Sequence, residues 1–150
     1  MITIVQRVSR AEVRVAGSTV GRIGAGALLL LGVEEGDLEA DALTTAQKLA
    51  RLRFFPGRTP MDLTLGQVGG QVLLVSQFTL AAGLDQGNRP SFTRAAPPAA
   101  AEALYDRVGA ELRRLGLEVA TGRFAAHMEV ELVNDGPVTF VLRVRGGRVD

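Results

Sequence analysis

The sequence predicts one α/β domain, with a mixed β-sheet and two main helices, that spans residues 1–150. Three observations lead to this fold class. A chain of 150 residues with 47% apolar content can bury one core but is too short for two comfortable ones. Two stretches repeat apolar residues at helical spacing, whereas the other apolar stretches alternate or run on as strands do. No internal repeat, linker or low-complexity tract divides the chain.

The first third of the chain is predicted to form strands. Residues 2–8 are extended and β-branched, and residues 11–17 alternate apolar and polar side chains up to a turn at Gly17-Ser18. Two more short strands follow within residues 18–33, punctuated by glycines. The last of them, ALLLLGV, has no polar face, so we expect a central strand buried on both sides.

Two helices are predicted, over residues 37–52 and from Pro97-Pro98 to just before Gly116. Asp37 is the expected N-cap of the first, which has acidic residues in its first turn and basic residues in its last. Proline at the start and glycine just past the end bracket the second helix. The apolar stripes predicted to face the core are Leu43, Ala46, Leu49 and Ala50 in the first helix, and Ala101, Leu104, Tyr105, Val108, Leu112 and Leu115 in the second.

Loops and strands fill the remaining positions. Residues 55–70 read as loop and turn, and QVLLV, residues 71–75, reads as a buried strand that ends at Ser76-Gln77. Residues 81–98 hold too much glycine, proline and polar content for regular structure, at a length where loops commonly carry a function. Two final strands, residues 127–133 and 138–144, flank the segment NDGPVTF.

The Gly136-Pro137 pair within NDGPVTF admits two interpretations. Pro137 fixes φ and removes a backbone donor where the next strand should begin pairing. The usual outcome is a tight hairpin with proline at the start of a strand. The alternative is a rigid corner, with a cis peptide, that contacts something else; cis is the rarer form before proline.

Composition excludes several classes of function. The formal net charge is +1, and the cations are sixteen arginines and one lysine, so no strong basic field indicates nucleic acid. The absence of cysteine excludes disulfides, thiolate metal sites and thiol nucleophiles, and a single histidine, His127, argues against a histidine metal cluster. The first ten residues do not resemble a signal peptide, and no apolar run reaches membrane-spanning length. We therefore expect a soluble, cytoplasmic protein.

The residues alone leave the chemistry open. Ser76 and Gln77 end a buried strand, a place where α/β sheets tend to bind ligands. Ser76 or Thr79 could act as a nucleophile, but neither has a titratable neighbour in its motif to serve as base. Arg89, with Phe92 nearby, could clamp a phosphate or remain a solvated surface residue. Phe124 could stack on a nucleobase or belong to the core, and His127 is expected on an exposed strand face.

Taken in order, the segments resemble the D-aminoacyl-tRNA deacylases, also known as the D-tyrosyl-tRNA deacylase family. The resemblance covers about residues 1–143. Its specific elements are the SQxT and NxGPVT motifs, supported in order by VQRVSRAEV, VGRIGAG, LLLLGV, KLARLRFF, VSQFTL, GNRPSF, TGRF and NDGPVTF.

The resemblance implies a barrel-like sheet and a homodimeric editing enzyme for translation quality control. Such an enzyme binds aminoacylated tRNA and hydrolyses the ester of D-aminoacyl-tRNA, and of glycyl-tRNA, with no cofactor, metal, membrane or DNA partner. The 2′-hydroxyl of the terminal adenosine is expected to assist the attack.

The resemblance also implies roles for individual residues. Ser76, Gln77, Phe78 and Thr79 would form the catalytic pocket, and Phe124 and Met128 would surround the terminal adenosine. Gly136-Pro137 would be cis and would reach into the partner's pocket to reject L-amino acids, supported by Arg7 and Asn134.

Three positions depart from the family's pattern, and two other functions stay open. Gln86 replaces a lysine, Ala125 replaces a glycine, and the loop near Met61 lacks the usual GKMN, which bears on tRNA contacts and loop shape. One alternative is an ester or amide hydrolase with Thr79 as nucleophile, and the other is a non-catalytic tRNA-binding dimer.

Overall fold

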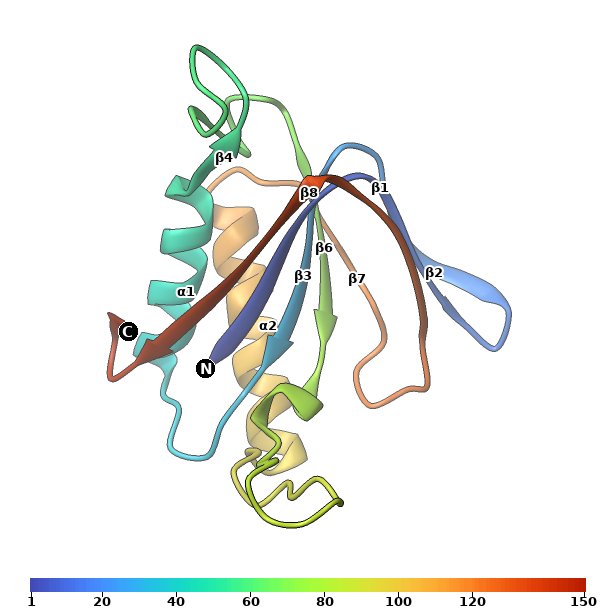
Figure 1. Cartoon of the computed structure of the whole chain (residues 1–150), viewed down its shortest axis with the longest axis vertical. Coiled ribbons are helices and arrows are strands. Elements are labelled where there is room, and N and C mark those ends of the chain that lie inside the picture. Colours follow the sequence, from blue (N-terminus) through green and yellow to red (C-terminus); the bar gives the residue numbers. More distant parts are fainter.

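The computed structural model describes all 150 residues as a curled sheet with two helices against one face (Figure 1). The larger sheet has the strand order β7-β6-β3-β1-β8-β9, with β2 paired to β1. The β3–β6 and β6–β7 pairs are parallel and the other pairs are antiparallel, which confirms the predicted mixed sheet. Its strands are β1 (Ile2–Val15), β2 (Ser18–Ile23), β3 (Gly26–Gly32), β6 (Gln71–Ser76), β7 (Val119–Thr121), β8 (Glu129–Arg145) and β9 (Arg148–Val149).

The other elements lie between these strands in the sequence. Two antiparallel strands form a small separate sheet within the predicted loop and its edge, and a 3₁₀ turn follows β6. No helix of the structure is both long and apolar enough to cross a membrane. These elements are α1 (Glu39–Arg51), β4 (Arg53–Phe55), β5 (Leu63–Thr64), η1 (Phe78–Ala81) and α2 (Pro98–Arg114).

The central strand β3 is covered on both faces, as predicted. Leu29 and Leu31 join the larger core beneath α1 and α2, whereas Leu28 packs into a second core with residues of β1, β2 and β6. The sheet can curl over this second core because β2 approaches β7 closely: a Cβ on Gly21 would lie 2.4 Å from the Thr121 carbonyl oxygen. The curl gives the sheet its half-barrel shape.

The hairpin interpretation of NDGPVTF is wrong. Residues 129–145 form one strand, β8, and both of its halves pair with the long strand β1 rather than with each other. Between the pairs Gln6–Thr139 and Val8–Asn134, β1 has one residue, Arg7, and β8 has four, Asp135–Val138. These four residues, which we call the corner, bulge out of the ladder where β8 bends at the top of the view (Figure 1). The Gly136–Pro137 peptide bond is cis.

Helix α1 begins two residues later than predicted, and Asp37 is not its N-cap. Leu38 holds that position, and its N–H donates to Asp41 Oδ2 at 2.8 Å. Asp37 instead accepts from the Met1 amino group at 2.7 Å and from the Glu34 N–H at 2.7 Å. The buried face of α1 also differs slightly from the predicted stripe: Leu43 and Ala50 are only half-buried. The buried residues are Asp41, Ala42, Thr45, Ala46 and Leu49.

Helix α2 follows the prediction. It runs from Pro98 to Arg114, and Gly116 follows in the left-handed region with φ of 87°. Tyr105, Val108 and Leu112 are buried beneath it, and the other predicted stripe residues are half-buried.

Candidate active site

A cavity of about 660 Å³ opens where β6 ends. Its walls come from the end of β6, the start of η1, the loop before α2, the first turns of α2 and residues 124–130. Fourteen of the 19 lining residues are hydrophobic. Volume and composition are those of a small-molecule or nucleoside site.

The Ser76–Thr79 segment turns sharply at the mouth of this cavity because β3 holds it from below. The Gln77 N–H donates to the Leu31 carbonyl at 2.7 Å, and the Leu80 N–H donates to the Gln77 carbonyl at 3.2 Å. Gly32 permits this approach, since a Cβ there would lie 2.9 Å from the Gln77 oxygen. The Gln77 side-chain amide donates to Thr79 Oγ1, which fixes the hydroxyl beside the turn.

The structure brings five of the predicted site residues together. Ser76, Gln77, Phe78, Phe124 and Met128 all line the cavity. Thr79 does not line it, but it lies next to Phe78 and is hydrogen-bonded to Gln77.

The remaining predicted residues gather elsewhere, at the corner. Arg7, Asn134, Gly136 and Pro137 do not line the cavity of their own chain. The predicted residues therefore form two separate groups within the chain.

Hydrogen bonds hold the corner in place. Arg7, only 9% exposed, donates from Nε to the Asp135 carbonyl at 2.9 Å and from Nη1 to the Phe54 carbonyl at 2.7 Å. Asn134 Oδ1 accepts the Val138 N–H at 2.9 Å and so bridges the base of the bulge. Gly136 and Pro137 themselves are exposed.

The cavity presents no activated nucleophile. Tyr105 and His127 are its only ionisable lining residues, and neither is hydrogen-bonded to Ser76 or Thr79. His127 is exposed, as expected, and Tyr105 donates its hydroxyl to the Leu74 carbonyl at 2.8 Å. A serine or threonine hydroxyl needs an adjacent base to attack an ester. The site can therefore orient a substrate and donate hydrogen bonds to it, but it holds no nucleophile–base pair.

Tyr105 gives the inner wall of the cavity a spectroscopic probe. Burial raises the pKa of Tyr105 to about 12 from its ordinary value of 10.0. Because the folded state keeps the proton longer, this contribution to stability is complete below about pH 10 and is lost as the pH rises to about 12. The chain has one tyrosine and no tryptophan, so phenolate absorbance reports this group alone. We expect a midpoint near 12 in the folded protein and near 10 in denaturant; a folded-state midpoint at 10 would contradict the buried placement.

Ala125, at the cavity wall, adopts the left-handed conformation with φ of 59°. Glycine, the residue that the resemblance implies at this position, would avoid the strain, since an L side chain there costs about 1–2 kcal/mol. We expect Ala125→Gly to raise the free energy of unfolding by about 0.5–1 kcal/mol, because the relieved strain outweighs the added chain entropy. Chemical denaturation measures it. Ala126→Gly, whose φ is ordinary, is the matched control and should lower stability by about 0.5–1 kcal/mol; equal effects of the two changes would contradict the strain.

Sequence reasoning missed part of the cavity wall. Phe92 was noted only as a neighbour of Arg89, and Tyr105 only as a core residue of the helix; both line the cavity, and Arg89 does not. Tyr105 serves both purposes, with its ring packed at 5.9 Å from that of Phe124. The signal available for Phe92 was its place in the GNRPSF segment.

Comparisons with known proteins show the family to which the chain belongs. The profile of the D-Tyr-tRNA(Tyr) deacylase family matches residues 4–143. A D-aminoacyl-tRNA deacylase of Heliobacterium modesticaldum is 53% identical over 148 residues, covering 98% of this chain and 99% of that protein. One of Anaeromyxobacter dehalogenans is 56% identical over 146 residues, covering 97% and 98%.

Two solved structures share the fold. One, described as "c-Myc DNA Unwinding Element Binding Protein", superposes with a TM-score of 0.90 at 35% identity and covers 97% of this chain and 100% of that one. Another, a probable eukaryotic D-amino acid tRNA deacylase, has a TM-score of 0.79 at 15% identity, covering 93% and 97%, and shows the fold alone. The fold is that of an α/β domain with a cavity at the end of β6. The chain belongs to the D-Tyr-tRNA(Tyr) deacylase family.

Proposed function

We propose that this protein hydrolyses the ester between a D-amino acid and its tRNA, acting as a cytoplasmic homodimer in translation quality control. One observation supports this function above the others: the turn formed by the family's SQxT motif lies at the mouth of the 660 Å³ cavity. Family membership over almost the whole chain supports the same activity.

In this proposal the terminal adenosine of the tRNA enters the cavity between Phe124 and Met128. Phe124 is half-buried against Tyr105. Met128 packs so closely on Gly122 that a Cβ added to Gly122 would lie 2.7 Å from the Met128 sulfur. An apolar slot of this kind suits the flat face of a nucleobase. The ester carbon then lies at the Ser76–Thr79 turn.

The turn is proposed to stabilise the reaction rather than to attack. The first N–H groups of η1 have no partner within the turn, and the Ser76 and Thr79 hydroxyls add further donors. Donors placed in advance around a developing oxyanion lower the barrier. The 2′-hydroxyl next to the ester is the group proposed to assist the attack on the carbonyl, since the cavity itself offers no base.

The corner is proposed to reject L-amino acids across a dimer axis. It is exposed, firmly held by Arg7 and Asn134, and absent from its own chain's cavity, so it is available to a partner's cavity. Backbone carbonyls aimed at the α-carbon would leave room for a hydrogen but collide with an L side chain. A D side chain would point out of the cavity and make no selective contact, so D-amino acids of many kinds would be accepted. Glycine has no side chain and would be accepted as well.

Deacylation of matched D- and L-tyrosyl-tRNA by the purified protein tests the function. We expect the D ester to be hydrolysed far faster than the L ester. Equal rates would remove the chiral mechanism, and binding of tRNA without loss of the amino acid would identify a non-catalytic tRNA-binding protein instead. Light scattering of the same sample tests the homodimer; a monomer would exclude a corner supplied by the partner.

A further inference from the structure

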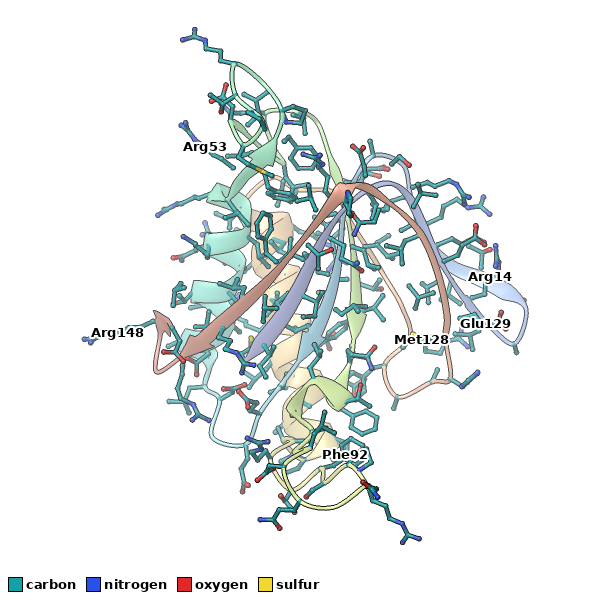
Figure 2. The ribbon with its side chains drawn as sticks, viewed as in Figure 1. Arg14, Arg53, Phe92, Met128, Glu129 and Arg148 are labelled. Carbon is teal, nitrogen blue, oxygen red and sulfur yellow. The ribbon has the colours of Figure 1, made fainter.

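A pair of exposed aromatic rings stands at the mouth of the cavity. Phe78 and Phe92 lie with ring centroids 5.0 Å apart, and they are 59% and 41% exposed. Both line the cavity, one from η1 and the other from the loop before α2. Figure 2 shows Phe92 on this loop at the lower end of the molecule, with Met128 near the start of β8. Two large rings left this accessible at a cavity mouth form a ready apolar surface.

The cavity thus has aromatic pairs at two depths. The inner pair is Tyr105, 4% exposed, and the half-buried Phe124. The outer pair is Phe78 and Phe92. If the terminal adenosine occupies the inner end, the strand must leave past the outer pair, so the base of the preceding nucleotide arrives there.

The backbone around Phe92 is fixed, although the loop has no regular structure. Ser91 and Gly83 exchange two backbone hydrogen bonds of 2.9 and 2.8 Å, and the Phe92 carbonyl accepts the Ala95 N–H at 3.0 Å. The loop is also tied to the segment that follows β3 through the Glu35 N–H, which donates to the Arg94 carbonyl at 2.8 Å. The ring is therefore presented on an ordered backbone, which lowers the entropy lost on binding.

We propose that Phe92, with the Phe78 ring beside it, stacks on the base of the nucleotide that precedes the terminal adenosine. The inference rests on the proposed function and adds a second nucleotide subsite to it. Stacking accepts any base face, so it suits an enzyme that must act on many tRNAs. It also supplies affinity to a protein whose net charge of +1 offers little general attraction to phosphates.

Phe92→Ala tests the subsite on two substrates, D-tyrosyl-tRNA and D-tyrosyl-adenosine, which lacks the preceding nucleotide. We expect KM for the tRNA to rise about 5- to 150-fold, the equivalent of 1–3 kcal/mol for one stacked base, with kcat little changed. The loss on D-tyrosyl-adenosine should be at least about fivefold smaller. Phe92→Tyr should restore tRNA binding, because its ring also stacks.

Leu84→Ala is the matched control, an apolar residue of the same loop that is 74% exposed and does not line the cavity. It should leave KM for both substrates unchanged. Equal losses on the two substrates in Phe92→Ala would show that Phe92 only shapes the adenosine pocket, and no loss on the tRNA would show that it binds nothing; either result overturns the subsite. Failure of the proposed function is distinguishable, since the unmodified protein would then hydrolyse neither D ester.

Discussion

Hydrolysis of D-tyrosyl-tRNA that ends in 2′-deoxyadenosine is expected to be about 10²–10⁴-fold slower than hydrolysis of the normal substrate, the usual contribution of a positioned proton-transfer group. The reason is the chemistry of the cavity. Ser76 and Thr79 have no hydrogen-bonded base, and the two ionisable lining residues are an exposed histidine and a tyrosine whose pKa is raised to about 12. If the protein supplies no base, the group next to the ester must contribute.

Single-turnover deacylation of the two substrates measures this effect. The uncatalysed rate of each ester should be measured alongside, because removing the 2′-hydroxyl also slows spontaneous hydrolysis, and the enzymatic acceleration is the quantity to compare. Thr79→Val separates the rival mechanism. A nucleophilic Thr79 predicts that the deoxy substrate is accelerated as strongly as the normal one and that Thr79→Val abolishes turnover; that pair of results would contradict assistance by the substrate.

Local patterns predicted most of the fold because most elements are specified by their own residues. ALLLLGV has no polar face, so it had to become the central strand, and proline and glycine bracket α2. Where a distant group competes, local rules failed. Aspartate is a residue type favoured at the N-cap, but the Asp37 carboxylate instead binds the Met1 amino group, 36 positions away.

The hairpin interpretation of the corner failed for a similar reason, whereas the cis peptide implied by the resemblance is present. A Gly-Pro pair between two segments of alternating apolar and polar residues predicts a hairpin, because the local sequence does not show which strand each segment pairs with. Both runs pair with β1, whose 14 residues extend past the corner in both directions. The first run packs into the second core and the last run into the core beneath the helices, so the corner marks where the β1–β8 ribbon passes from one core to the other.

The site was predictable only as far as its motifs reach. The resemblance assigned Ser76–Thr79 to the catalytic pocket and Phe124 and Met128 to the adenosine pocket, and all of these residues except Thr79 line one cavity of the structure. Phe92 lies 14 positions from Phe78 along the chain, and their rings lie 5.0 Å apart because the loop folds back on itself, with a bridge between Gly83 and Ser91. A contact of this kind depends on how a loop folds back, which no periodicity encodes.

Arg7→Lys is expected to lower the preference for D- over L-tyrosyl-tRNA at least about tenfold, mainly by raising hydrolysis of the L ester. Arg7 faces the four-residue corner and holds two carbonyls from one guanidinium, those of Asp135 at 2.9 Å and Phe54 at 2.7 Å. Lysine keeps the charge but cannot reproduce that fork. Each charge-assisted hydrogen bond contributes about 1.5–3 kcal/mol, and 1.4 kcal/mol of lost positioning is already tenfold in discrimination.

Arg10→Lys is the matched control, an arginine of the same strand that is 59% exposed and pairs with Glu131 at the surface. It should leave the D/L ratio unchanged. Because Arg7 is buried, Arg7→Lys should also lose about 1.5–3 kcal/mol of stability, so denaturation curves must show that it is folded at the assay temperature.

A mixed dimer locates the corner's action. When Arg7→Lys is paired with a chain inactivated at Gln77, the only working cavity faces an intact partner corner, and rejection of the L ester should return. If the mixed dimer stays permissive, the corner acts within its own chain, and the cross-subunit wall is wrong.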